Sequence, residues 1–365
     1  MFKYSFIYYI FMKKSDPKEF SKSKTDLAGT ILCNMQSSEK EKNDALLVLS
    51  NWRASHNYPM HIFKKRLKRV SEKIDKNALS AQRLKRVPSI INKLNRKYDN
   101  NKATMKLTQM QDIAGCRVVL SNIELVNELY NKYYFESDLK HKKINEKNYI
   151  LNPKSDGYRS IHLIYKYNSD KGKSNYNGLL VEVQLRSKLQ HLWATAVETV
   201  DFFTRQAIKS NEGQEEWVTF FRLVSSAFAK LENCPIIANT QQNEKELYSL
   251  IKQKEKELNV RTKMKHWSKS VKLFDNLKSG KGLHFFLLEL DTIQEKLTIS
   301  AYSKRQEQKA IFDYAQAEKK IYGRKEYDVV LVGADTFQDL KKAYSNYFLD
   351  TKEFLKYLDK ILNKY

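Results

Sequence analysis

The residue types best suited to chemistry lie in two stretches, Lys154–His162 and Glu182–Arg186. In the first, Gly157 lets the chain turn tightly beside Tyr158, whose ring could stack on a purine. The second alternates polar and apolar residues, so an extended strand would send its even-numbered side chains to a polar face and its odd-numbered ones to a core. This pattern predicts two half-polar strands that form a floor for a charged ligand. A buried, hydrogen-bonded histidine is the alternative role for His162.

A second candidate is the basic segment Arg83–Lys93. Lys85, Ser89 and Lys93 recur every four residues and would lie along one stripe of a helix. Such a stripe offers two ammonium groups and a hydroxyl to a row of phosphates. Pro88 indicates a kink or a new helix start near Ser89, because it lacks the backbone donor of a helical hydrogen bond. Considered alone, the stripe has the alternative of a solvated basic face.

A third candidate is Asp112, which stands at the mouth of an apolar strand. A carboxylate in this position is a natural ligand for Mg²⁺, and Glu182 could supply a second one. The alternative for Asp112 is a turn residue at a strand start. Simple alternation does not place Asp112 and Arg117 on the same face of a strand.

The composition is that of a folded protein with a strong basic excess. The 365 residues are 41% hydrophobic, and 66 Lys and Arg against 42 Asp and Glu give a net charge of +24. The excess is concentrated from residue 61 to residue 97, where 13 basic residues stand against two acidic ones. Concentrated charge of this kind favours polyanionic partners such as nucleotides or RNA over a merely soluble basic surface.

The cysteines and the first residues bear on the compartment. Cys33, Cys116 and Cys234 are odd in number and far apart, which argues against a disulfide framework and against a cysteine zinc site. We therefore expect a cytoplasmic protein. The apolar stretch 2–12 is too short to span a bilayer, so no membrane partner is expected. The sequence leaves open the oligomeric state and whether the first or the second methionine is the true start.

The periodicity predicts two mixed units and several helical stretches. Helical patterns dominate 17–100 and 189–258, and the Gly-containing basic segment 278–282 is the best linker candidate. The expected strands are 113–120, 158–167, 179–186, 283–290, 297–302 and 328–332. The expected helices outside the two helical stretches are 123–133, 304–321, 336–344 and 351–362, and a basic amphipathic helix is expected at 59–74.

In this order, the segments resemble the RelA/SpoT family of pyrophosphokinases over about residues 60 to 205. Four motifs carry the resemblance: R-x-K-x-x-x-S-I-x-x-K at Arg83–Lys93, D-x-x-x-x-R at Asp112–Arg117, G-Y-x-S-I-H at Gly157–His162, and E-x-Q-x-R at Glu182–Arg186. The resemblance implies an α+β fold, with a mixed-sheet synthetase domain flanked by helices and a smaller C-terminal α/β domain of pseudo-zinc-finger type.

The resemblance also implies a reaction and roles for residues. ATP would donate its β,γ-pyrophosphate to a ribose 3′-hydroxyl, with Mg²⁺ as the metal. The ATP-binding residues would be Arg83, Lys85, Ser89, Lys93 and Arg117. The acceptor-binding residues would be Lys154, Gly157, Tyr158, His162 and Gln184. The metal ligands would be Asp112 and Glu182, which with Tyr158 form the catalytic set.

Two departures from the family bear on the acceptor. The loop Lys154–Arg159 and the residue Thr195 differ from the pattern of long synthetases. The segment 191–198 looks more like the toxic small alarmone synthetases, some of which modify the 3′ end of tRNA. The first hypothesis is therefore an enzyme that pyrophosphorylates tRNA CCA ends and blocks translation. The alternatives are a synthetase of (p)ppGpp or (p)ppApp and an inactive RNA-binding regulator.

The C-terminal unit resembles the appended domain of CapRel-like fused toxin–antitoxin proteins of phage defence. In that group the domain holds the enzyme off until a phage protein binds, with a capsid protein among the candidates. The family's Y-x-x-Y motif would be Tyr344 and Tyr347, whose alternative is to pack as a helix end. The resemblance implies four regions: an N-terminal helical region 1–58, a synthetase domain 59–210, a helical linker 211–279 and a C-terminal regulatory domain 280–365.

Overall fold

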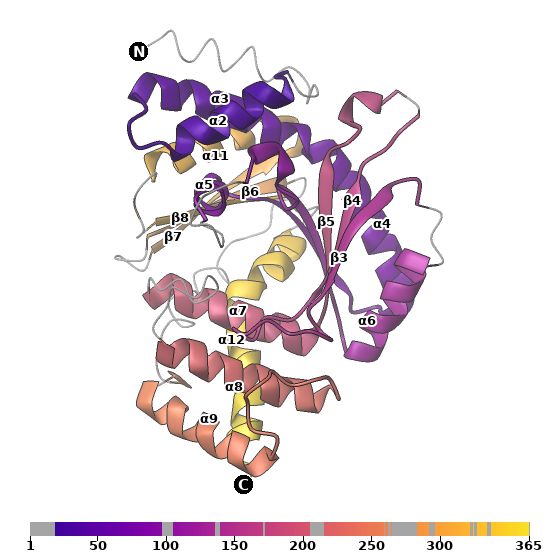
Figure 1. The fold of residues 1–365 in the computed structure, drawn as a ribbon, viewed down its shortest axis with the longest axis vertical. Coiled ribbons are helices and arrows are strands. Elements are labelled where there is room, and N and C mark those ends of the chain that lie inside the picture. Colours follow the sequence, from indigo (N-terminus) through magenta and orange to yellow (C-terminus); the bar gives the residue numbers. More distant parts are fainter. Residues whose placement is uncertain are drawn as a thin grey trace.

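A mixed five-stranded sheet stands at the centre of the structure (Figure 1). The computed structural model describes residues 19–96, 105–135, 139–170, 172–204, 215–258, 260–261, 264, 283–291, 296–321, 324, 327–333 and 337–364. The strands of this sheet, in the order β1-β2-β5-β4-β3, are β1 (Leu79–Leu84), β2 (Ala114–Leu120), β5 (Leu180–Ser187), β4 (Ile161–Lys166) and β3 (Lys142–Asn148). β2 and β5 run parallel, and the other neighbours run antiparallel. The predicted α+β class with a mixed, helix-flanked sheet is confirmed.

Helices surround this sheet, and a second sheet completes the described fold. The helices are α2 (Lys22–Cys33), α3 (Glu39–Ser55), α4 (Asn57–Ile74), α5 (Val87–Leu94), α6 (Ile123–Tyr130), α7 (Lys188–Thr204), α8 (Glu215–Leu231), α9 (Glu244–Leu258), α11 (Glu307–Lys320) and α12 (Phe337–Leu362). The second sheet, in the order β7-β6-β8, is formed by β7 (Lys296–Ser303), β6 (Leu283–Asp291) and β8 (Tyr327–Gly333). No described helix combines the length and the apolar character needed to cross a membrane.

One face of the five-stranded sheet is apolar and carries the core. Val181, Val183 and Leu185 of β5 are fully buried, as the alternation predicts. The helices α4 and α6 cover this face, with Phe63 and Leu67 of α4 buried in the same cluster. Burial of these side chains fixes the register, because a slip of one residue would turn the polar row into the core.

The opposite face of the sheet is polar. The strand register sets Arg83, Gly115 and Glu182 abreast on β1, β2 and β5. It also sets both Arg117 and His162 opposite Gln184. Directly opposed residues point to the same side of a sheet, so side chains from four separate segments converge on this face.

The segment Arg83–Lys93 does not form one helix, which corrects the predicted stripe. Arg83 lies in β1, Lys85 lies in the turn after it, and α5 begins at Val87 with Pro88 in its first turn. The polar sequence of β1 does not predict a strand, and β1 forms because β2 offers it an antiparallel partner. The predicted helix start near Ser89 is confirmed.

Two further elements differ from their predicted bounds. The strand expected from Tyr158 begins only at Ile161, because Gly157 and its neighbours form a loop that docks on helices. The two helices expected at 336–344 and 351–362 are one continuous helix, α12. The turn-forming residues around Asp350 do not break α12, because that part of the helix packs on α7.

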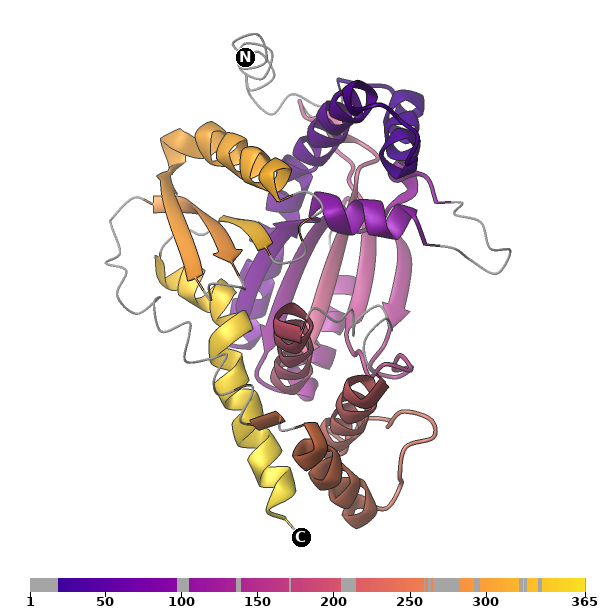
Figure 2. The same cartoon turned by 90° about the vertical axis from the view of Figure 1, so that its left-hand side faces the viewer.

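The helix α12 runs along the lower helices and away from the three-stranded sheet (Figure 2). Phe354, Leu358 and Ile361 are buried in one cluster with residues of α7, α8 and α9. The three-stranded sheet packs on α11, and β8 lies beside β1. The C-terminal segment therefore contacts both the five-stranded sheet and the helices that follow it. The predicted region boundaries stay predictions.

The sheet divides the described part of the basic run, residues 61–96. The lysines and arginines of α4 belong to a helix that packs on the apolar face. Arg83, Lys85 and Lys93 belong to the polar side. The charge of α4 is consequently separated from the polar row by the thickness of the sheet, and only part of the run lies beside the candidate site.

Candidate active site

Asp112 holds two lysines beside the polar face. Lys85 Nζ donates to Asp112 Oδ2 over 3.1 Å, and Lys93 Nζ donates to Oδ1 over 2.8 Å. Burial raises the pKa of the Asp112 carboxyl, but the two ammonium groups outweigh it, so this pKa is lowered and the carboxylate stays ionised. Burial lowers the pKa of Lys85, and Asp112 offsets part of that change. The cluster carries a net positive charge suited to phosphate.

A chain of hydrogen bonds runs along the polar row from Arg186 to Glu182. Arg186 Nη2 donates to the Tyr158 hydroxyl over 2.7 Å, and that oxygen lies 2.7 Å from His162 Nε2. His162 Nδ1 lies 2.9 Å from Glu182 Oε1, and Gln184 Nε2 donates to Oε2 over 2.5 Å. When Nδ1 carries the proton and donates to the carboxylate, the hydroxyl donates to Nε2. The row can thus move a proton between Tyr158 and Glu182.

Glu182 connects this chain electrostatically to Asp112. Burial raises the pKa of the Glu182 carboxyl, but the hydrogen bond from His162 and the other hydrogen-bonding and electrostatic contacts of the carboxyl outweigh it, so the pKa is lowered. The charge of Asp112 acts in the raising direction. The two carboxylates therefore interact electrostatically across the polar face, although Asp112 comes from the loop before β2 and Glu182 from β5.

The ring of Tyr158 lies among cations. Lys154 Nζ is 5.2 Å and Arg186 Cζ is 5.1 Å from its centroid, and Lys154 Nζ is also 5.0 Å from the ring of Tyr149. Lys154 is exposed, whereas Arg186 is 5% exposed. A base that stacks on Tyr158 would therefore displace Lys154 and leave Arg186 in place.

Two of the Arg186 guanidinium nitrogens are available to bind a ligand. Its Nε and Nη1 are buried and have no hydrogen-bond partner in the described part of the chain. Buried donors without partners are rare in folded proteins and point to a ligand or a water. Arg186, which belongs to the E-x-Q-x-R motif but had no predicted role, is thus a candidate site residue.

The loop before β4 is held by the helices α7 and α8. Gly157 has φ +101°, and a Cβ there would lie 2.8 Å from Trp193 Cζ2 and 3.0 Å from Ser225 Cβ. Ser225 Oγ donates to Gly157 O over 2.6 Å and accepts from Arg159 Nε over 3.0 Å. Only glycine combines this conformation with so close an approach. Tyr158 therefore takes its position from a loop clamped between two helices.

The carboxylates fit Mg²⁺ better than a metal that needs several protein ligands. The described residues contain no group of three or more His, Cys, Asp and Glu side chains that could hold a metal. Mg²⁺ usually takes one or two carboxylates and completes its shell with water and substrate phosphates. Asp112 and Glu182 are both kept ionised and lie on one face, so they suit such a shared site.

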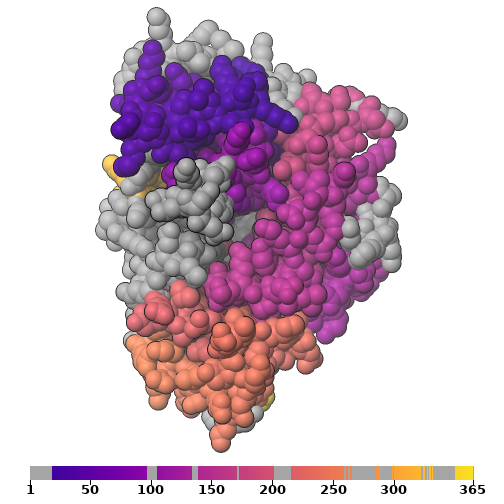
Figure 3. Space-filling model, in the orientation of Figure 1, coloured from indigo at the N-terminus to yellow at the C-terminus, as the bar shows by residue number. Residues whose placement is uncertain are grey.

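Most of the predicted site residues gather on or beside the polar face. Figure 3 shows this side of the molecule hollowed between the purple residues that include α5 and the magenta strands. The residues joined there by contacts or register are Arg83, Lys85, Lys93, Asp112, Arg117, Lys154, Tyr158, His162, Glu182 and Gln184. Ser89 lies in α5. Tyr344 and Tyr347 lie in α12, but their side chains are outside the described part.

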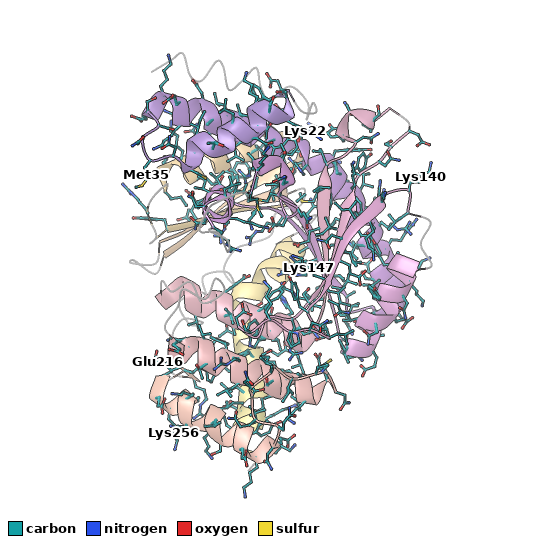
Figure 4. All side chains as sticks on the ribbon, in the orientation of Figure 1. Lys22, Met35, Lys140, Lys147, Glu216 and Lys256 are labelled. Atoms are coloured by element: carbon teal, nitrogen blue, oxygen red, sulfur yellow. The ribbon has the colours of Figure 1, made fainter. Side chains whose placement is uncertain are left out.

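Two further residues, Tyr149 and Lys147, lie beside the predicted site residues, although no sequence motif pointed to them. Tyr149 packs edge-on against Tyr158 with ring centroids 5.8 Å apart. Lys147 lies on β3 opposite His162 and is labelled in Figure 4. The strand β3 is rich in Lys, Asn and Glu, so periodicity gave no signal for it. A search for aromatic residues close in sequence to the Tyr158 loop would have found Tyr149.

Comparison with known proteins places this site within a described family region. The family model described as "Region found in RelA / SpoT proteins" matches residues 82–202. Two curated relatives from Bacillus subtilis (strain 168) align with part of the chain. GTP pyrophosphokinase YjbM is 29% identical over 120 residues, 33% of this chain and 54% of the relative. GTP pyrophosphokinase YwaC is 33% identical over 113 residues, 31% of this chain and 52% of the relative.

The chain spans about half the length of these curated relatives. Among solved structures, small alarmone synthetase 1 from Bacillus subtilis bound to its product pppGpp has a TM-score of 0.41 at 22% identity, covering 49% of this chain and 89% of that one. Small alarmone synthetase 2 from the same organism has a TM-score of 0.40 at 20% identity, covering 51% and 94%. Residues 82–202 thus carry a RelA/SpoT synthetase region with homologues among the GTP pyrophosphokinases.

Proposed function

We propose that this chain is a pyrophosphokinase that transfers the β,γ-pyrophosphate of ATP to a ribose 3′-hydroxyl. The observation that carries the proposal is the convergence on one polar face of the Lys85–Asp112–Lys93 cluster and the Tyr158–His162–Glu182 chain. Both lie inside the matched RelA/SpoT region. A cationic cluster beside a carboxylate row suits in-line transfer between two negatively charged substrates.

The residues divide into a donor side and an acceptor side. Lys85 and Lys93 neutralise ATP phosphates, and Tyr158 orients the acceptor. The attacking hydroxyl gives its proton to the Tyr158 oxygen as Tyr158 passes its own proton to His162, and the ionised Glu182 stabilises the imidazolium that forms. Mg²⁺, held by Asp112 and Glu182, would supply charge neutralisation at the phosphates. The lysines then exchange Asp112 for phosphate oxygens, which frees that carboxylate for the metal.

The proposed acceptor is the 3′-CCA end of tRNA, so that the reaction blocks translation. The net charge of +24 supports a large polyanion, since phosphate neutralisation gives affinity independent of sequence. Arg83 and Lys147 extend the positive charge along the polar side of the sheet. The names of the curated relatives favour a second candidate, synthesis of (p)ppGpp or a related alarmone.

One assay separates these candidates. The full chain, carrying Tyr344→Ala to relieve the inhibition proposed below, is incubated with Mg²⁺, ATP labelled in its terminal phosphates and either deacylated tRNA or guanosine and adenosine nucleotides. We expect label in tRNA, and Asp112→Asn should reduce transfer by about 100-fold, because the site loses one of its two proposed carboxylate ligands for Mg²⁺. Label only in nucleotides would establish the alarmone reading. Binding of tRNA with no transfer to any acceptor would establish an inactive RNA-binding regulator.

We further propose that the C-terminal region holds the enzyme inactive in the cytoplasm until a phage protein, such as a capsid protein, binds it. Truncation is a poor test, because α12 buries Phe354, Leu358 and Ile361 against the helices before it. Tyr344→Ala or Tyr347→Ala in the full chain should raise transfer, whereas Lys356→Ala, at an exposed position of the same helix, should not. Equal activity of all these variants and the parent would remove the inhibitory proposal.

A further inference from the structure

A buried ion pair joins the N-terminal helices to the C-terminal unit. Arg53 Nη1 of α3 lies 3.0 Å from Glu318 Oε2 of α11, with both side chains 7% exposed. Tyr314 completes the cluster: its hydroxyl accepts from Arg53 Nη2 over 3.1 Å and donates to Glu318 Oε1 over 2.6 Å. The three side chains thus satisfy one another in a place where an isolated charge would be costly.

The same cluster also forms hydrogen bonds with the backbone of the turn that contains Lys85. Arg53 Nε donates to Lys85 O over 3.0 Å, and Glu318 Oε1 accepts from the Val87 backbone N–H at 3.3 Å. Lys85 N–H in turn donates to Ile113 O over 2.8 Å. The turn between β1 and α5 is therefore fixed from two sides, by the five-stranded sheet and by α11.

These backbone hydrogen bonds help to position the two lysines that contact Asp112. Lys85 lies inside the turn, and Lys93 lies near the end of the helix whose first turn Glu318 holds. The ammonium groups of both lysines reach Asp112. A displacement of the turn would move Lys85 relative to Lys93, and phosphate contacts of this kind depend strongly on geometry.

We infer that Arg53 and Glu318 are positioning residues for the donor site, so that the C-terminal unit helps to build the site that binds ATP. The inference rests on the proposed function only in taking ATP as the ligand of Lys85 and Lys93. The contribution of α11 is opposite in sign to the inhibition proposed for Tyr344 and Tyr347. By linkage, ATP should in turn stabilise the docking of α11.

The first test compares Glu318→Gln with Asp313→Asn in the full chain. Asp313 lies on the same helix and accepts from the Tyr302 hydroxyl over 2.8 Å, so its variant perturbs the C-terminal unit without touching the Lys85 turn. We expect the Kd of ATP–Mg²⁺, measured by calorimetry, to rise about tenfold in Glu318→Gln, the effect of one hydrogen bond to a charged group. Asp313→Asn should keep the parental Kd. The comparison is repeated with Tyr344→Ala present, so that the proposed inhibition cannot mask binding.

The second test needs no variant at the cluster. Amide hydrogen exchange in 307–320 should slow when ATP–Mg²⁺ is added, while exchange in α9 stays unchanged. An equal Kd for the two variants, a lower Kd for Glu318→Gln, or unchanged exchange in α11 would overturn the inference. Normal ATP binding without transfer to any acceptor would overturn the proposed reaction alone. No ATP binding in either background would overturn both.

Discussion

At the scale of single residues, the polar row of β5 was predictable and its partners were not. Strict alternation in Glu182–Arg186 predicts the outward row, which the burial of Val183 and Leu185 confirms. The pairing of Asp112 with Lys85 and Lys93 could not be read from spacing, because the two lysines lie in different elements. Which side chains meet across a sheet depends on the register of its strands, and local sequence does not determine that register.

The Tyr158 hydroxyl is the residue-scale feature with the sharpest test. Tyr158→Phe keeps the ring but leaves His162 Nε2 and Arg186 Nη2 without this partner. We expect kcat for the proposed pyrophosphate transfer to fall by about 10- to 100-fold, and the free energy of unfolding by about 1–2 kcal/mol, because the buried Arg186 and the half-buried His162 each lose a hydrogen bond. Steady-state kinetics and urea unfolding measure the two effects.

Tyr130→Phe is the matched control for this substitution. Tyr130 donates to Glu146 Oε1 over 2.6 Å at the end of α6, away from the polar row. It should show a similar loss of stability with parental kcat. If Tyr158→Phe also kept the parental kcat, the hydroxyl would have no part in the transfer.

At the scale of elements, the strands with clear apolar periodicity could be predicted from the sequence, whereas the polar strands could not. β2 is mostly apolar, β5 alternates apolar and polar residues, and both lie within a residue of their predicted starts. β1 and β3 contain few β-branched residues, and they form strands because β2 and β4 offer edges to pair with. The predicted helical linker includes α8, whose Ser225 holds the Tyr158 loop. Tertiary contacts of this kind override local propensity.

Gly157, in the loop that α8 holds, should be more sensitive to substitution than Gly172, which has open space around it. Gly157→Ala would place a Cβ 2.8 Å from Trp193 Cζ2 at φ +101°. We expect a loss of unfolding free energy of about 2–4 kcal/mol, from backbone strain and the clash, and a drop in transfer, because Tyr158 follows directly. Chemical unfolding and the transfer assay give the two values.

Gly172→Ala isolates the strain from the clash. Gly172 has φ +54°, but no atom lies within 4 Å of its would-be Cβ. A cost of about 1 kcal/mol with unchanged transfer is expected for this variant. An equal loss of unfolding free energy in Gly157→Ala and Gly172→Ala would mean that the α7 and α8 side chains around Gly157 move aside at no cost in stability.

At the scale of the whole molecule, long-range contacts make the C-terminal segment part of one assembly. Asp350 of α12 lies 2.8 Å from His191 Nε2 and 3.1 Å from Lys188 Nζ on α7. Contacts across more than 150 positions leave no local pattern, which is why the sequence suggested a break in α12 instead. His191 is fully buried, so its protonation couples the docking of α12 to pH.

The sign of this coupling follows from the His191 pKa. Burial lowers that pKa to about 4 from an ordinary value of 6.5, although Asp350 acts in the opposite direction. Arg117 and Arg186 also lower it, and Lys188 adds positive charge to the cluster. Between about pH 6.5 and pH 4 the unfolded chain therefore binds more protons than the folded chain, and stability falls as pH falls. Asp350 has a lowered pKa of its own, so its contribution is lost only at more acidic pH.

His191→Gln should flatten this part of the stability profile. The parent should lose on the order of 3 kcal/mol of unfolding free energy between pH 6.5 and pH 4 through this one group, and the variant should not. Urea unfolding at several pH values measures the slope. His61→Gln, at an exposed position of α4, should keep the parental slope. A parental slope in His191→Gln would mean that His191 is already charged when folded, and that its contact with Asp350 is an ion pair rather than a neutral hydrogen bond.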